Sequence, residues 1–318
     1  FRGDLTRDWR AANPDVEPAT ELLARLRQER RQRWEQAERA KYEAKGKTPP
    51  KNWQSKYKEP QPLTETQLAE LQELPEGWCW ASTDTVSEVI VDCPHSTPKW
   101  SDAGEICIRT TNFRPGFLDL TQVKYVSKET YESRIARLKP EPGDVVYSRE
   151  GGILGIACSI PDDTTLCLGQ RMMLMRTWKG LVEGDYLTMI LNSPQILTIV
   201  QRLTGGSASP HLNVGDIKAF PIPLPPVEEQ RVILTQTKAL LGFGSRVSGI
   251  ATECTNDLTT LTQSVLAKAF RGELVPQDPN DEPASLLLAR LRQQREAEAA
   301  TKKKPKRKAA RKKGITAA

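Results

Sequence analysis

The residue types that catalyse reactions are scarce in this sequence. Its two histidines, His95 and His211, both lie in segments interrupted by proline. Either imidazole could act as a general base, but no serine, cysteine or aspartate stands at a spacing that supports a catalytic triad. Pro161-Asp162-Asp163 begins like a nuclease carboxylate cluster, yet no Glu-x-Lys pair follows to complete a metal site. We therefore expect both histidines to be polar groups of loops and residues 161–163 to form a turn.

Sequence motifs for nucleotides and cofactors are also absent. The chain has no G-x-x-x-x-G-K-[ST] loop for a nucleoside triphosphate, no glycine-rich strand-to-helix unit for a dinucleotide, and no Pro-Pro-aromatic signature of a DNA methyltransferase. Its six cysteines form no C-x-x-C pair, and that density in 318 residues is ordinary for reduced thiols in the cytosol. We expect a cytoplasmic protein with no catalytic residue, metal or cofactor in this chain.

The charge of the chain is unevenly distributed. The sequence has 46 Lys and Arg against 40 Asp and Glu, a formal net charge of +6, but residues 301–318 alone hold nine Lys and Arg and no acid. Residues 1–60 are at +5, so residues 61–300 are at −8. We expect residues 301–318 to be a disordered arm, which either attracts polyanions or only keeps the chain soluble. No apolar run reaches the roughly 18 residues of a membrane-spanning helix.

Two segments are repeated in the same order. Residues 17–28 recur as residues 282–293 with 10 of 12 positions identical, and Phe1-Arg2-Gly3-Asp4-Leu5 recurs as Phe270-Arg271-Gly272-Glu273-Leu274. A period of about 265 residues is far too long for a solenoid, whose repeats run to roughly 50 residues. We infer that a large unit was duplicated. We expect this chain to hold one unit and the end of the preceding one, with Phe1 an internal position of a longer parent.

Six segments follow from composition and periodicity. We expect a helical region at 1–44, a linker at 45–73, a mixed domain at 74–226, a long helix at 227–270, a repeat of the N-terminal segment at 271–300 and the tail at 301–318. Trp53 and Tyr57 of the linker could dock on a surface. The fold class is α+β: a mixed α/β domain followed by a long coiled-coil-like helix that packs antiparallel to a partner helix.

Within the domain, short β-favouring runs alternate with Gly, Pro and Asp turns. The strands are expected at 105–110, 123–126, 144–147 and 171–177, and a helix at 185–203. The proline-rich residues 221–226 should stop any strand or helix.

Apolar residues then return at helical spacing from Val227 to Phe270. The glycines at 242, 244 and 249 should weaken this helix, so a kink or break is expected there. A lone helix of this length would expose its apolar stripe and needs a partner helix.

Several short sequence motifs, taken in their order along the chain, resemble those of the DNA-specificity subunit of type I restriction-modification systems. They are Leu74-Pro75-Glu76-Gly77-Trp78, Pro140-Glu141-Pro142-Gly143-Asp144-Val145-Val146, Thr204-Gly205-Gly206-Ser207-Ala208, Ile222-Pro223-Leu224-Pro225-Pro226-Val227-Glu228-Glu229-Gln230-Arg231 and Ala269-Phe270-Arg271-Gly272-Glu273-Leu274. Each motif alone is weak evidence for the resemblance, but the order and spacing of the motifs over residues 74–274 are specific.

The resemblance implies a subunit that catalyses nothing itself. In that family two target-recognition domains each read one half of a bipartite target in double-stranded DNA, and long antiparallel helices set the spacing between the halves. Methyltransferase subunits dock on the specificity subunit, and a restriction and translocase subunit joins them. S-adenosylmethionine, ATP and Mg²⁺ are expected on those partner subunits. This chain would supply one recognition domain, and a second half or a second copy could pair with its long helix.

Base reading requires side chains that present donors and acceptors in the major groove. Residues 109–114, 148–152 and 204–211 are the segments in which we expect such side chains. The candidates for DNA contact, including one lysine outside these segments, are Arg109, Asn112, Arg114, Lys124, Ser148, Arg149, Glu150, Gly206, Ser207, Ser209 and His211. Glycines in the second and third segments would let backbone N–H groups approach phosphates. We expect Arg149→Ala to change base preference and Lys124→Ala to weaken binding uniformly.

A structural interpretation competes at these positions. Gly151, Gly152, Gly205 and Gly206 could simply form tight turns, and Arg109 and Arg149 could pair with Glu105 and Glu150.

The alternative function is a coiled-coil scaffold whose basic tail binds nucleic acid without reading its sequence. A self-contained methyltransferase or nuclease would need motifs that this sequence lacks.

Overall fold

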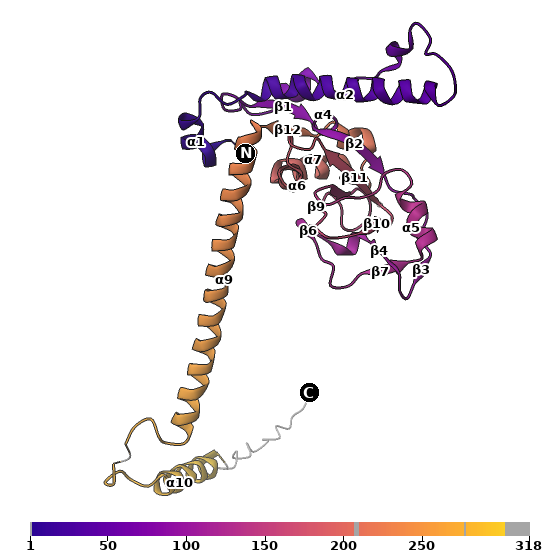
Figure 1. The fold of residues 1–318 in the computed structure, drawn as a ribbon. Coiled ribbons are helices and arrows are strands. Elements are labelled where there is room, and N and C mark those ends of the chain that lie inside the picture. The colour runs from indigo at the N-terminus through magenta and orange to yellow at the C-terminus, as the bar shows by residue number, and fades with distance from the viewer. Residues whose placement is uncertain (1, 207–209, 277, 303–318) are drawn as a thin grey trace, which may run out of the picture. The chain divides into compact units, whose positions relative to one another are not determined.

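The computed structural model describes residues 2–206, 210–276 and 278–302 (Figure 1). It divides into two compact units between Gly242 and Phe243. All strands of the described residues lie in the first unit. The long helix α9 (Val227–Phe270) begins in the first unit and ends in the second, which also contains α10 (Ala284–Lys302). The expected fold class, a mixed helix and sheet domain followed by a long helix, is confirmed.

The first unit is built on three sheets. The largest has the strand order β2 (Ser87–Asp92), β11 (Met172–Thr177), β8 (Val145–Ser148), β9 (Ala157–Ser159), β6 (Gly116–Leu118) and β5 (Phe113–Arg114). The second has the order β10 (Leu166–Leu168), β4 (Glu105–Ile108), β7 (Lys124–Val126) and β3 (Trp100–Ser101). The third pairs β1 (Cys79–Ser82) with β12 (Pro221–Leu224). The strands predicted near 105, 123, 144 and 171 are confirmed as β4, β7, β8 and β11.

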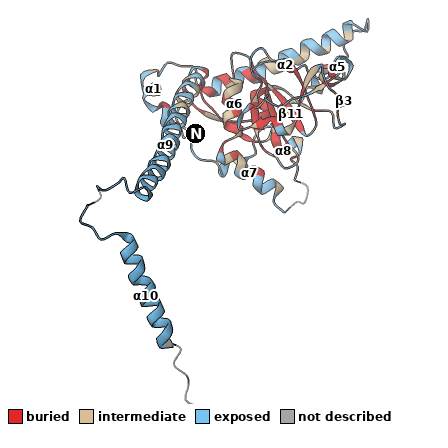
Figure 2. Cartoon of the chain, turned by 90° about the horizontal axis from the view of Figure 1, so that it is seen from below, coloured by how far each residue is buried: buried red, intermediate tan, exposed pale blue. Residues whose placement is uncertain are grey.

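Both faces of the largest sheet are buried. Along β11, Met173 and Met175 belong to one apolar cluster, whereas Met172 and Leu174 belong to another. This alternation is the period of two that a strand imposes on its side chains. The first cluster includes Trp78 and residues of the helices α6 (Gly184–Leu191) and α7 (Pro194–Thr204). Figure 2 shows the buried residues concentrated in this domain.

The helix predicted at 185–203 is two helices, α6 and α7. Ser193 separates them, and its hydroxyl accepts a hydrogen bond from the backbone N–H of Ile196 at 3.4 Å. Pro194 is tolerated at the first position of α7 because the N–H that it lacks would have no partner there. The apolar periodicity continues across the break, so periodicity alone could not reveal it.

Residues before 74 pack on the domain. Leu22 and Leu26 of α2 (Ala19–Glu43) are buried in the same cluster as Trp78, and α2 lies against β1 and α4 (Thr83–Val86). The interpretation of residues 1–44 and 45–73 as a helix and a linker outside the domain therefore misses these contacts. The reason is that α2 has only a narrow apolar face, which the surrounding Arg and Glu residues conceal in the sequence.

A buried carboxylate connects this N-terminal segment to the root of α9. Glu229 is fully buried, and it accepts hydrogen bonds from the Thr6 hydroxyl at 2.5 Å, from Arg10 of α1 (Arg7–Ala12) at 2.5 Å and from the Trp78 indole at 2.8 Å. A buried charge is tolerated when it is paired and hydrogen-bonded in this way.

The expectation that the prolines at 221–226 stop any strand is wrong. Residues Pro221–Leu224 form β12, which is antiparallel to β1. Pro221 and Pro223 alternate with Ile222 and Leu224, so the missing N–H groups fall on every second residue. A strand with a partner on one side only can turn those residues away from its partner.

The helix α9 is uninterrupted, and no break occurs at its three glycines. Beyond its root the apolar residues of α9 are exposed, and a partner helix packed antiparallel to it stays an expectation. No helix of the described residues combines the length and hydropathy that a membrane crossing requires.

The two copies of the repeated segments share local structure. Gly3 and Gly272 both have left-handed φ angles, 74° and 72°. Arg25 pairs with Glu17 in the first copy, and Arg290 pairs with Glu282 in the second. Their burial differs: Leu22 and Leu26 are fully buried, whereas Leu287 and Leu291, which stand at the matching positions of α10, are half-exposed.

Candidate nucleic-acid interface

Three strand ends meet at one edge of the largest sheet. β11 is antiparallel to both β2 and β8, with Met173 opposite Asp92 and Met172 opposite Ser148. The start of β11 therefore lies beside the ends of its two neighbours. This register brings together Asp92, Arg149 and Arg171, which are far apart in the sequence.

Asp92 anchors the polar groups of this edge. Its two carboxylate oxygens accept hydrogen bonds from Nε and a terminal nitrogen of Arg149, at 2.9 and 3.0 Å. His95 Nε2 lies 3.1 Å from the same carboxylate. A bidentate arginine–carboxylate pair fixes both partners in one orientation.

Arg149 is a structural residue of this edge. Its side chain is buried, and it also pairs with Glu150 at 2.9 Å and donates to the carbonyl of Leu212 at 2.9 Å. All three guanidinium nitrogens thus have partners. The interpretation that pairs Arg149 with Glu150 matches the structure, and direct contact of Arg149 with DNA stays a prediction.

The second and third predicted segments lie side by side. Glu150 forms an isolated antiparallel bridge with His211, the N–H of Gly151 donates to the carbonyl of Pro210, and the N–H of Leu212 donates to the carbonyl of Arg149. Gly206 is exposed and has φ of 82°. Ser207 and Ser209, which were also predicted to contact DNA, lie outside the described residues.

Two polar residues at this edge were missed by the sequence analysis. Gln170 is partly exposed and donates from its side-chain amide to the carbonyl of His95. Arg171 is exposed, forms no ion pair within the described part of the chain, and has φ of 67°. A left-handed φ in a residue other than glycine is strained, and such strain is found preferentially at functional sites. The signal in the sequence that could have identified these two residues is their position between Gly169 and a buried strand.

We call this group of side chains the Asp92 cluster. Its members are Asp92, His95, Arg149, Glu150, Gln170, Arg171 and His211. His95, Arg171 and His211 are exposed, whereas Arg149 is buried behind them. The exposed members offer hydrogen-bond donors on a rigid support, which is what recognition of nucleobases or phosphates requires.

The first predicted segment is held by its own contacts. Buried Asn112 donates to the carbonyls of Asp119 and Gln122, at 3.0 and 2.9 Å, and accepts from the N–H of Arg109. Arg114 pairs with Asp119 at 2.9 Å. Hydrogen bonds from Thr121, together with Arg114, lower the pKa of Asp119. Asn112 therefore has a structural role, and its amide is already occupied.

Ser148 and Lys124 have opposite environments. Ser148 is fully buried, and its hydroxyl accepts from the N–H of Ile156 at 3.0 Å. Lys124 is exposed, with its ammonium 5.1 Å from the centre of the Trp100 ring. Of these two residues, only Lys124 could reach DNA without rearrangement.

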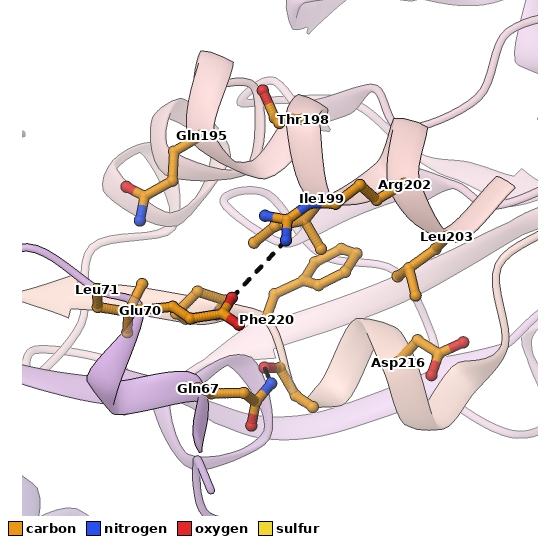
Figure 3. Close-up of a pocket in the computed structure, with 12 residues that line it drawn as sticks. Gln67, Glu70, Leu71, Gln195, Thr198, Ile199, Arg202, Leu203, Asp216 and Phe220 are labelled. Atoms are coloured by element: carbon orange, nitrogen blue, oxygen red, sulfur yellow. Dashed lines mark hydrogen bonds and ion pairs between the residues drawn. The ribbon is translucent and has the colours of Figure 1, made fainter. Parts of the chain in front are cut away.

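A separate pocket of about 500 Å³ lies between α3 (Glu65–Ala69), α7 and α8 (Val214–Lys218). Arg202 extends across it toward Glu70, and the two charges are 3.7 Å apart (Figure 3). None of the predicted site residues lines it, so it is distinct from the Asp92 cluster. Among the residues that the structure describes, no group of His, Cys, Asp and Glu side chains could hold a metal ion.

Comparison with known proteins identifies the domain. Residues 120–241 match the family model of the type I restriction modification DNA specificity domain. This part of the chain is therefore similar to the type I DNA specificity domain. The specificity subunit of the EcoKI type I restriction enzyme from Escherichia coli is 27% identical over 218 residues, which cover 64% of this chain and 46% of that subunit. The EcoBI specificity subunit, also from Escherichia coli, is 27% identical over 198 residues, which cover 60% and 41%.

Among solved structures, the HsdS subunit from Thermoanaerobacter tengcongensis aligns with a TM-score of 0.41 and 22% identity, over 64% of this chain and 47% of that one. The chain spans about half the length of the curated type I specificity subunits that it matches. The family match begins at residue 120, so it includes Arg149, Gln170, Arg171 and His211 of the Asp92 cluster, whereas Asp92 and His95 lie before it.

Proposed function

We propose that this chain reads part of a double-stranded DNA target as the non-catalytic specificity subunit of a type I restriction-modification complex. The observation that carries the proposal is the match of residues 120–241 to the specificity domain, because two of the three predicted contact segments lie in that range and meet at the Asp92 cluster. We assign base contact to the partly exposed Gln170 and the exposed Arg171 rather than to the buried Arg149. Arginine pairs with guanine and glutamine with adenine in the major groove.

The domain cannot attract DNA strongly by charge alone. Residues 76–225 hold 14 basic and 17 acidic residues, a net charge of −3. Affinity for the phosphate backbone must therefore come from outside the domain. We propose that methyltransferase subunits dock on this chain and clamp the DNA, and that a restriction subunit joins them. S-adenosylmethionine, ATP and Mg²⁺ belong to those subunits in this proposal.

The exposed stripe of α9 supports a further part of the proposal. Its apolar residues Val247, Ile250, Leu258, Leu261 and Val265 recur at helical spacing and are all exposed. Such a stripe is typical of a helix that packs on another helix. We propose that α9 pairs with a second long helix and so sets the distance between two half-sites.

Mapping of methylated bases in the host genome tests the reading function. Deletion of this chain should abolish methylation at one bipartite motif. Arg171→Ala or Gln170→Ala should relax that motif at one position, because one good bidentate contact contributes about 1–3 kcal/mol of discrimination between bases. The control is Lys139→Ala, an exposed lysine on which the proposal does not rest. An unchanged motif in both the Gln170 and Arg171 variants would contradict the assignment of these residues. Unchanged methylation after deletion would contradict the function itself.

A further inference from the structure

Residues 45–62, which belong to the predicted linker, fold back along α2 (Figure 1). Trp53, which begins the short 3-10 helix Trp53–Lys56, stacks on Trp34 of α2 with ring centres 5.7 Å apart and an angle of 19° between the planes. The Tyr57 ring also packs on Trp34, at 5.3 Å. Trp53 is buried by these contacts. The prediction that Trp53 and Tyr57 could dock on a surface is confirmed, and the surface is α2 itself.

The second half of α2 and the segment that folds back along it together carry an excess of positive charge. Residues 25–58 hold twelve Lys and Arg and only four Glu. Five lysines of the returning segment are exposed and form no ion pair within the described ranges: Lys45, Lys47, Lys51, Lys56 and Lys58. The arginines of α2 are different, because Arg30 is held by Asp84 and Arg33 by Glu88. We call residues 44–58 the basic arm.

A pocket of about 470 Å³ lies where the basic arm meets the domain. Its lining includes four cationic side chains, those of Arg30, Arg33, Lys56 and Lys58, and one carboxylate, that of Glu88. Since Arg30 and Arg33 are paired with Asp84 and Glu88, the excess positive charge of the lining comes from Lys56 and Lys58. Such a lining favours an anion over a cation or an apolar ligand.

Two hydrogen-bond donors in the lining of this pocket lack acceptors. Trp178 is almost fully buried, and its indole N–H has no hydrogen-bond partner in the described part of the molecule. The buried hydroxyl of Tyr57 also has none among these residues. Burial, with Glu59 as a smaller cause, raises the pKa of Tyr57, so its hydroxyl keeps its proton. Buried donors without acceptors are costly, and both of these donors belong to residues that line the pocket.

We propose that this pocket and the lysines of the basic arm bind the phosphate backbone of duplex DNA. The inference rests on the proposed function, because that function brings a duplex to the chain. A polymer fits better than a single small anion, since Lys45, Lys47 and Lys51 continue the positive charge beyond the residues that line the pocket. The arm would supply part of the sequence-independent affinity that the domain, at −3, lacks.

Binding of the full chain to duplexes of random sequence, measured against salt concentration, tests this proposal. The variant Lys56→Gln with Lys58→Gln should flatten the plot of log affinity against log salt by about 1 to 2 units, because each lost phosphate contact removes roughly 0.9. Affinity near physiological salt should fall roughly five- to tenfold. The matched control, Lys128→Gln with Lys139→Gln, removes two exposed lysines elsewhere and should change the slope less. All variants retain the Lys-rich tail, so its contribution is common to them.

A second variant separates placement of the arm from its charge. Trp34→Ala removes the stacking platform without changing any charge, and it should also flatten the salt dependence, whereas Trp34→Phe should restore it. If Trp34 has only a structural role, Trp34→Ala should lower the unfolding midpoint and leave the salt dependence of DNA affinity unchanged.

Two results would overturn the proposal. One is an equal salt slope in the wild type and in the Lys56 and Lys58 variant. The other is that this variant no longer assembles with the methyltransferase subunits but binds DNA as the wild type does. That result would mean that the basic arm binds an acidic protein surface. The duplexes used here have random sequence, so this test does not depend on sequence reading. If the methylation maps contradict the proposed function, the salt dependence still tests the basic arm, and the two proposals can fail separately.

Discussion

The guanidinium group of Arg149 ties together three parts of the chain at one edge of the largest sheet. It binds Asp92 at the end of β2, Glu150 in the loop after β8, and the carbonyl of Leu212 in the segment before α8. These contacts hold the loop and the segment against the sheet. The neighbouring Gln170 and Arg171 therefore rest on a support that the buried Arg149 provides.

Replacement of Arg149 should destabilise the domain. Arg149→Met leaves Asp92 and Glu150 without their cation at a largely buried position, and we expect a loss of about 2–4 kcal/mol in the free energy of unfolding. Arg171→Met is the matched control, because Arg171 is exposed and has no ion pair within the described residues; its effect should stay within about 0.5 kcal/mol. Urea unfolding of both variants measures the difference, and equal losses would contradict the structural role of Arg149.

Two of the segments predicted from the sequence meet at this edge, but the ion pair of Arg149 with Asp92 was not predicted. Arg149 was a candidate for base contact because it is an arginine in an expected loop, and arginine pairs with guanine in the major groove. Its main partner, Asp92, is 57 residues away, and only the pairing of β11 with β2 and β8 brings the two together. Long-range ion pairs leave no periodic signal in a sequence. Arg171 was missed because its left-handed φ is a property of the folded backbone that the sequence does not show.

At the scale of elements, the repeated segments provide a matched comparison. Leu22→Ala should cost about 2–5 kcal/mol, because it opens a cavity in the core. Leu287→Ala changes the equivalent residue of α10, which is half-exposed, and should cost less than about 0.5 kcal/mol in the isolated chain. Urea unfolding followed by circular dichroism distinguishes the two. Similar losses would mean that α10 is packed as tightly as α2.

Asp84 couples α2 to α8 and should make stability depend on pH. Burial alone would raise the pKa of Asp84, but the N–H of Gln61 and the cations of Arg30 and Lys218 outweigh it and lower the pKa. A carboxylate whose pKa is lower in the folded state stabilises the fold above its unfolded pKa of about 3.9, and this contribution is lost as the pH falls through the folded pKa.

Asp84→Asn should therefore be less stable than the wild type at pH 7, and the difference should narrow as the pH falls below about 4. Unfolding midpoints measured from pH 7 to pH 2 give the comparison. A difference that stays constant over this range would show that the charge of Asp84 does not contribute.

The elements themselves were partly predictable. The strands β4, β7, β8 and β11 and the long helix α9 follow from periodicity and β-favouring composition, because their buried or apolar faces repeat with the period of the element. Two features could not be predicted from periodicity and composition. The proline strand β12 depends on its partner β1, and the burial of α2 depends on the domain that it covers, so neither can be decided from the local sequence.

At the scale of the whole molecule, the exposed stripe of α9 should determine association. If its partner is a second copy, the full chain should sediment as a dimer. Leu258→Glu with Leu261→Glu should then give a monomer, because it places charge in an apolar helix interface. Asn256→Glu with Gln263→Glu adds the same charge on another face of α9 and should leave the dimer intact. A wild-type chain that is monomeric at high micromolar concentration would assign the partner helix to another polypeptide.

The stacked indoles of the basic arm provide an optical reporter. Trp34 and Trp53 are close and nearly parallel, so their electronic transitions should couple and give a pair of bands of opposite sign in the ultraviolet circular dichroism spectrum. Trp34→Phe would remove this signal without removing the aromatic contact. The chain can therefore report on its own arm during a titration with DNA, with no added label.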